Sequence, residues 1–198
     1  VNSNIKGQNH VGAVVGSSVQ NSQLYSIYST GSVVGTGDAV GGLVGQQQDG
    51  SKIESTYSTS QVTGQNHVGG LVGTNQNAII KDTYATGAVN GLSNVAGLVG
   101  SNQNQATIQN AYATGRVTGN SLVGGLVGNN YYDAEIKNAY VTGAVTGNDR
   151  VGGLVGENLA AKIENTYALG KVTGTTAVGG LLGKNVQGVV TNSYWDKN

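Results

Sequence analysis

The chain has 198 residues, no net formal charge and only 10% charged residues, so it lacks the basic surface that binding to nucleic acid or to an anionic membrane requires. Cysteine is absent, which excludes disulfides, thiolate metal sites and a thiol nucleophile. Glycine is abundant, at 34 residues, and it interrupts every apolar run, so no segment is long enough to cross a bilayer.

A six-residue phrase, Val-Gly-Gly-Leu-Val-Gly or a close variant, recurs seven times in steps of 27 to 29 residues. It begins at Val11, Val40, Val68, Val95, Val123, Val151 and Val178. Self-similarity at this period is typical of stacked equivalent units. We therefore predict a single all-β domain over residues 1–198, a parallel β-solenoid (β-helix) of about seven coils and about 28 residues per coil, with the usual right-handed crossover. The predicted units are 7–34, 35–63, 64–90, 91–118, 119–146, 147–173 and 174–198.

Three short strands are predicted in each unit, in the following chain order. The glycine-rich phrase comes first, for example at 123–128. An Ile-x-Asn-x-Tyr segment with period-two alternation follows, for example at 136–140, and a short stretch reaching a Val-x-Gly step closes the unit. No window has a sustained apolar stripe of period 3.6, and the glycine content disfavours helices.

Units differ in length at only two places, which we assign to surface turns. One lies between the Val-x-Gly glycine and the next Val-Gly-Gly, and the other follows the last glycine of the phrase. The first residues join the pattern in mid-phrase, since Ile5-Lys6-Gly7 matches Val62-Thr63-Gly64. We therefore expect the chain to be a segment of a larger protein.

Equivalent residues of successive coils should lie one above another, which pairs charges across coils. The expected pairs are Glu54 with Lys81, Lys137 with Glu164, and Glu135 with Lys162. Two polar columns predict ladders of side-chain hydrogen bonds. These columns are Ser26, Ser55, Asp82, Asn110, Asn138, Asn165 and Asn192, and Ser18, Gln47, Asn75, Asn102, Asn130, Asn158 and Asn185.

Strict alternation along the glycine-rich phrase would place its valines on one face and its leucine on the other. One face would then carry an exposed apolar contact stripe, for which the candidates are Leu43, Leu71, Leu98, Leu126, Leu154 and Leu181, or else the valine pairs. Such a stripe would support self-association or a protein partner. In the alternative, a glycine-permitted kink turns both sets inward.

Tyrosine and threonine form further columns. The tyrosine column is expected to be a stacked ladder, with a glycan-binding aromatic stripe as the alternative. Its members are Tyr28, Tyr57, Tyr84, Tyr112, Tyr140, Tyr167 and Tyr194. One threonine column, which would suit ice binding if it were flat, is Thr30, Thr59, Thr86, Thr114 and Thr142, and a second is Thr63, Thr118, Thr146 and Thr173.

No catalytic, cofactor or metal site is predicted, and we expect the chain not to be an enzyme. The densest charged cluster is Asp133, Glu135, Lys137, Lys162 and Glu164, which would supply the carboxylates of a polysaccharide-acting enzyme as a remote alternative. His10 and His67 share a turn phrase but lie two coils apart, at about 9–10 Å, too far for one zinc ion.

The phased phrases V-G-G-L-V-G and I-x-N-x-Y-A-T-G-x-V-x-G resemble the GLUG motif of large bacterial surface proteins, including IgA-peptidase-type and filamentous-haemagglutinin-like exoproteins. The closing Asn192-Ser193-Tyr194-Trp195-Asp196 resembles the end of such arrays. The resemblance implies a secreted or cell-surface β-solenoid that acts as a structural and adhesive module. A protein or cell-surface partner is expected, with self-association through the solenoid ends as a further route. An ice- or glycan-binding solenoid is the alternative.

Overall fold

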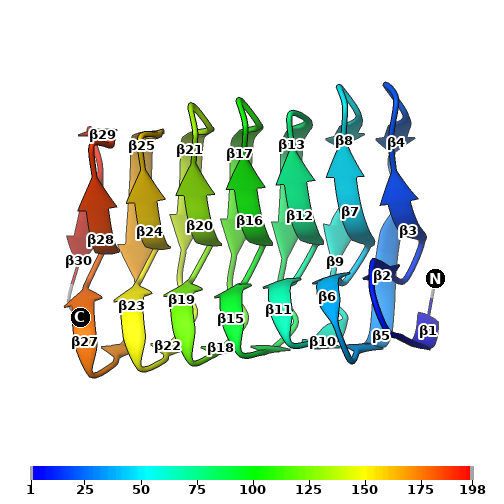
Figure 1. Ribbon diagram of the computed structural model, residues 1–198, viewed down its shortest axis with the longest axis horizontal. Helices are drawn as coiled ribbons and strands as arrows, with labels where there is room; N and C mark the ends of the chain where they lie inside the picture. The colour runs from blue at the N-terminus through cyan, green and yellow to red at the C-terminus, as the bar shows by residue number, and fades with distance from the viewer. Residues whose placement is uncertain (1, 197–198) are drawn as a thin grey trace.

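The computed structural model describes residues 2–196, which form one continuous stack of parallel strands with no helix among them, and therefore no helix that could span a membrane. Seven coils follow one another along one axis (Figure 1). Equivalent residues pair in register, so that Val68 lies between Val40 and Val95, and Tyr84 lies beside Tyr112. The predicted parallel β-solenoid is confirmed.

Two seven-stranded sheets contain the glycine-rich phrase (Figure 1). The first consists of β2 (Val11–Gly12), β6 (Asp38–Gly41), β11 (Asn66–Gly69), β15 (Ser93–Ala96), β19 (Ser121–Gly124), β23 (Asp149–Gly152) and β27 (Thr176–Gly179). The second consists of β3 (Val15–Ser18), β7 (Val44–Gln48), β12 (Val72–Gln76), β16 (Val99–Gln103), β20 (Val127–Tyr131), β24 (Val155–Leu159) and β28 (Leu182–Val186).

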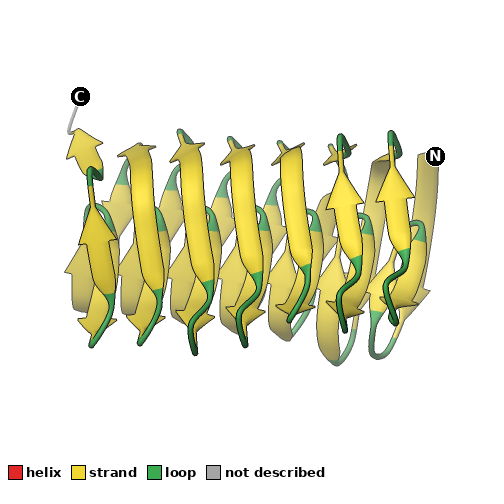
Figure 2. Cartoon of the chain, turned by 90° about the horizontal axis from the view of Figure 1, so that it is seen from above, coloured by secondary structure: helices red, strands yellow, loops and turns green. Residues whose placement is uncertain are grey.

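The rest of each coil belongs to a 16-stranded sheet with two arms, joined by β5 (Tyr28–Gly35). The valine arm is β1 (Asn2–Gly7), β10 (Gln61–Thr63), β14 (Val89–Asn90), β18 (Val117–Thr118), β22 (Val145–Thr146) and β26 (Val172–Thr173). The tyrosine arm is β4 (Gln23–Tyr25), β8 (Lys52–Glu54), β9 (Tyr57–Ser58), β13 (Ile79–Ala85), β17 (Thr107–Ala113), β21 (Glu135–Val141), β25 (Lys162–Leu169), β29 (Val189–Thr191) and β30 (Tyr194–Asp196). Figure 2 shows the strands of successive coils side by side along the stack.

The prediction of a single strand for the glycine-rich phrase is wrong, because the phrase forms two strands separated by a kink. In the third coil β11 ends at Gly69 and β12 begins at Val72. The kinked backbone remains hydrogen-bonded between coils, since the Leu71 carbonyl accepts from the Leu43 N–H at 2.9 Å and the Val44 N–H at 3.1 Å. Because the kink breaks the alternation, the two halves of the phrase face different cores.

The molecule therefore has two separate apolar cores. The first valine of each phrase, such as Val68, packs with the valine arm in a valine-rich core. The leucine and second valine, such as Leu71 and Val72, pack with Ile80 of the tyrosine arm in a larger core. Burial of each aliphatic side chain contributes about 1.5–3 kcal/mol to the free energy of folding, so both cores are major sources of stability.

Glycine is required where the two seven-stranded sheets meet. A Cβ on Gly100 of the second sheet would lie 2.5 Å from the carbonyl carbon of His67 and 2.6 Å from the amide nitrogen of Val68 in the first sheet. The glycine at the third position of the phrase approaches the 16-stranded sheet: a Cβ on Gly97 would lie 2.3 Å from the carbonyl oxygen of Gly125 and 2.9 Å from the Cβ of Ala113. The absence of a side chain at these positions lets the kinked backbone lie close to the neighbouring sheets.

We expect Gly100→Ala to lower the free energy of unfolding by about 1–3 kcal/mol, because backbone atoms cannot move aside for a methyl group. Denaturant unfolding measures the change. The matched control is Gly16→Ala, at the same position of the phrase in the first coil, where a Cβ would lie 2.9 Å from the carbonyl oxygen of His10 and the glycine is exposed. An equal effect of the two substitutions would contradict the role assigned to close backbone approach at Gly100.

The turn between the second seven-stranded sheet and the tyrosine arm varies in length, as predicted for a surface turn. Four coils have two consecutive residues with positive φ here, as in Asn104-Gln105 and Tyr132-Asp133. The other three have one, for example Asn77 in the third coil. One residue is therefore added or lost in the left-handed region, which leaves the strands on either side in register.

Candidate functional site

The leucines of the predicted contact stripe lie in the larger core, so the expectation of an exposed stripe is wrong. Leu43, Leu71, Leu98, Leu126 and Leu154 are fully buried, and Leu181 is half-buried in the last coil. The valines that begin the phrases are also buried from the first to the sixth coil. The kink turns both sets inward, which was the alternative, and self-association through this stripe is therefore not available.

Five of the seven tyrosines of the predicted column, from Tyr28 to Tyr140, form a stacked ladder on the outer face of the tyrosine arm. Ring centroids from Tyr28 to Tyr140 lie 4.8–5.1 Å apart, with interplanar angles of 2–10°. Burial within the stack, together with its tyrosine neighbours, raises the pKa of Tyr112 above its ordinary value of 10.0. Both faces of the inner rings are covered, so this column cannot offer them to a sugar ring.

Threonines lie two residues beyond the tyrosines on the same outer surface. Thr59, Thr86, Thr114 and Thr142 are exposed, and Thr30 is half-buried. The second column, Thr63, Thr118, Thr146 and Thr173, is also exposed but belongs to the valine arm. A turn separates the two columns, for example between Ala113 and Val117, and the exposed Arg116 lies in it. We call the tyrosine column and the first threonine column, Thr30, Thr59, Thr86, Thr114 and Thr142, the tyrosine–threonine face.

Both polar ladders form, and they differ in burial. In the buried ladder the side-chain amide of Asn75 donates to Asn102 at 2.8 Å, and the bonds continue through Asn130 and Asn158 to Asn185. In the exposed ladder Asn110 donates to Asp82 at 2.8 Å, and Asn138, Asn165 and Asn192 continue the series. Every residue of the exposed column has a φ of 46–54°, which explains the Asn, Asp and Ser found there.

The charged residues pair with one another on open strand faces. The predicted contact of Glu54 with Lys81 is present at 3.3 Å, but the shorter bond of Glu54, 2.7 Å, is to Lys52 of its own strand. Lys137 likewise bonds Glu135 at 2.8 Å, although Glu164 is its register partner in the next coil. Residues two apart on one strand face lie about 6.6 Å apart and cross-coil neighbours about 4.8 Å apart. Lysine and glutamate side chains are long enough to span both distances, so the column pattern alone cannot choose between the two partners.

The charged cluster considered for hydrolysis shows no arrangement of two carboxylates across a cleft. A shallow depression of about 190 Å³ is lined by Asp133 and Lys162, whereas Glu135 and Glu164 lie outside it. Residues 2–196 contain no group of three histidine, aspartate or glutamate residues that could hold a metal ion. His67 is separated from His10 by Ala39 in the same column, and burial lowers the pKa of His67 while Asp38 opposes that shift.

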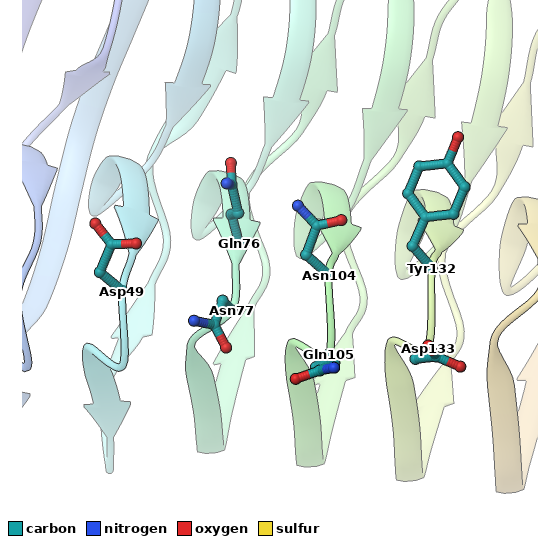
Figure 3. A pocket seen from close by; sticks show the side chains of 7 residues that line it. All are labelled: Asp49, Gln76, Asn77, Asn104, Gln105, Tyr132 and Asp133. Atoms are coloured by element: carbon teal, nitrogen blue, oxygen red, sulfur yellow. The ribbon is translucent and has the colours of Figure 1, made fainter.

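A second, larger hollow of about 400 Å³ lies on the turns that precede the tyrosine arm. Seven residues from four neighbouring coils line it: Asp49, Gln76, Asn77, Asn104, Gln105, Tyr132 and Asp133. Figure 3 shows them in two rows, with Gln76, Asn104 and Tyr132 in one and Asn77, Gln105 and Asp133 in the other. The turn of the third coil, which is one residue shorter, lies between the longer turns of the second and fourth coils at this hollow.

These turn residues were not among the sequence candidates. The available signal was the Tyr131-Tyr132 doublet at the end of β20, because Tyr132 stands in a turn where the other coils have mainly amide, carboxylate or small side chains. We call the seven residues the turn hollow.

Comparisons with known proteins agree with the architecture. The family model described as the GLUG motif matches residues 64–90, 91–118, 119–146 and 147–173, which coincide with four of the repeat units defined from the sequence. A search of curated proteins finds no match. A crystal structure described as a putative immunoglobulin A1 protease from Bacteroides ovatus is similar in fold, with a TM-score of 0.61 and 20% identity. The similarity covers 85% of this chain and 60% of that one.

Proposed function

Because the chain belongs to the family defined by the GLUG motif, we propose that it is a non-enzymatic structural and adhesive module of an exported bacterial surface protein. The observation that carries the proposal is the tyrosine–threonine face, where an exposed threonine returns beside the tyrosine ladder in four successive coils, at Thr59, Thr86, Thr114 and Thr142. A repeated face offers many weak contacts at once, and linked weak contacts give avidity without a deep site.

The axial ladders support the structural part of this role. Stacked tyrosines link the first five coils to one another, and buried asparagines link the third coil through to the seventh. Such a body holds its exposed columns at fixed spacing, and little conformational entropy is lost when they engage a partner. The likeness to the Bacteroides ovatus protein supports the solenoid fold on which this structural role rests.

A bead-adhesion assay tests the adhesive part. Beads coated with the chain should adhere to cultured epithelial cells, and adhesion should rise steeply with coating density. The triple variant Thr86→Lys, Thr114→Lys, Thr142→Lys should reduce adhesion by about tenfold or more, because it places three adjacent charges on the face.

The matched control adds the same three charges to a different exposed turn, through Gln65→Lys, Leu92→Lys and Asn120→Lys. It should leave adhesion within about twofold of the original chain. Equal loss in both triple variants would point to bulk charge rather than to the face. Beads that adhere no better than uncoated beads would remove the adhesive role.

A further inference from the structure

The turn hollow combines an exposed aromatic ring with amide and carboxylate groups. Tyr132 is 54% exposed and contacts Tyr131 edge-on, with ring centroids 4.8 Å apart and an interplanar angle of 71°. This contact fixes the orientation of the Tyr132 ring at the edge of the hollow (Figure 3). Unlike the inner tyrosines of the ladder, Tyr132 is not enclosed between two parallel rings.

Folding does not explain a tyrosine at this position. Tyr132 has a φ of 56°, in the left-handed region that asparagine, aspartate and glycine tolerate better than a bulky side chain. Asp49 and Asn104 adopt the same conformation in the corresponding turns of other coils. A large, half-exposed ring in a conformation that costs free energy indicates a selected role outside the core.

The polar groups of the hollow are free to bind a ligand. Asp49, Asn77, Asn104, Gln105 and Asp133 are exposed, and their side chains make no hydrogen bond within residues 2–196. The backbone beneath them is fixed, because the amides of Gln105 and Asp133 donate to the next coil at 3.0 and 2.9 Å. Amide and carboxylate groups on a rigid base can pair with neighbouring hydroxyls of a sugar without further ordering.

The charge of the hollow selects among ligands. Its two carboxyl groups are those of Asp49 and Asp133, and no basic side chain lines it. Anionic ligands would therefore be repelled. The two carboxylates stand three coils apart, about 14 Å at the strand spacing, so they cannot share one cation. An uncharged ligand that is rich in hydroxyls and has an apolar face for the ring of Tyr132 fits this lining of amides, carboxylates and one exposed ring.

We propose that the turn hollow binds a neutral glycan chain lying along the solenoid axis, with one pyranose ring on Tyr132 and its neighbours hydrogen-bonded by the amides of the adjacent coils. The row of equivalent turns presents these amides in steps of one strand spacing, which suits a linear polymer better than a single compact ligand. The binding site is distinct from the tyrosine–threonine face and does not depend on the adhesive role proposed for that face.

The first test is titration of the full chain with neutral gluco-, galacto-, manno- and xylo-oligosaccharides and with sialylated and uronic-acid oligosaccharides, observed by NMR. At least one neutral series should shift the backbone amides of the four turns at 48–50, 76–78, 103–106 and 131–134. Failure of every neutral series to bind, preferential binding of acidic oligosaccharides, or shifts confined to other residues would each overturn the proposal.

Variants at Tyr132 separate binding from folding. Tyr132→Asn places a residue that favours positive φ, so it should unfold at the same temperature as the original chain or higher, yet bind the glycan about tenfold more weakly or worse. Tyr132→Trp should retain binding because it keeps an aromatic face. The control Tyr140→Ala removes an exposed tyrosine of the same coil outside the hollow and should leave affinity unchanged. Unchanged affinity in Tyr132→Asn would refute the role of the ring.

Discussion

Replacement of Leu98 by alanine is expected to lower the free energy of unfolding by about 3–5 kcal/mol. The side chain is fully buried in the larger core, which contains the equivalent leucines of the neighbouring coils, and truncation would leave a cavity that its rigid surroundings cannot fill. Chemical denaturation followed by circular dichroism measures the loss. A loss of this size would show that Leu98 is buried, because truncation of an exposed leucine in a contact stripe would change the stability only slightly.

Leu92→Ala is the matched control for this substitution. Leu92 belongs to the same coil but is 56% exposed, so its truncation should change the free energy of unfolding by less than about 0.5 kcal/mol. If Leu98→Ala retained the stability of the original chain and instead weakened adhesion to cells, the leucines would have to be surface contacts, and the buried position would be wrong.

The second large effect is expected at the buried asparagine ladder. Asn102 accepts from Asn75 and donates to Asn130, each at 2.8 Å, and it also donates to the carbonyl of Ala106. Asn102→Ala would leave these partners short of hydrogen bonds in a region closed to solvent, at a cost of about 2–4 kcal/mol. Thermal and denaturant unfolding should both register the loss.

The exposed ladder supplies the comparison. Asn110 makes side-chain bonds to the coils on either side of it, as Asn102 does, but it is exposed. Asn110→Ser keeps a residue type already present in that column at Ser26 and Ser55, so it should cost less than about 1 kcal/mol. Similar losses at Asn102 and Asn110 would show that burial does not determine the strength of these ladders.

The repeat period was sufficient to predict the coil number, the register and the ladders. Once Tyr84 and Tyr112 occupy equivalent places in a 28-residue period, stacking brings their rings together, and the same reasoning applies to Asn102 and Asn130. Variation in turn length was also predictable, because turns absorb an added residue and paired strands do not.

The path of the glycine-rich phrase could not be predicted from the pattern alone. Alternation assumes an unbroken strand, and glycine permits both an extended and a kinked backbone, so Leu71 could have faced either way. The turn hollow was missed for a different reason. Its residues share no column motif, and the depression arises from a one-residue difference in length between neighbouring turns.

The register between coils also bears on how such a chain can change over generations. A duplication or loss of one whole unit restores every pairing, so the stack would lengthen or shorten by about 4.8 Å with its interior intact. An insertion or deletion of a few residues within a strand would instead shift the sequence, so that residues less suited than Asn110 to a left-handed backbone would occupy its position. Genetic recombination can therefore change the length of the solenoid in discrete steps, while the fold of each coil stays the same.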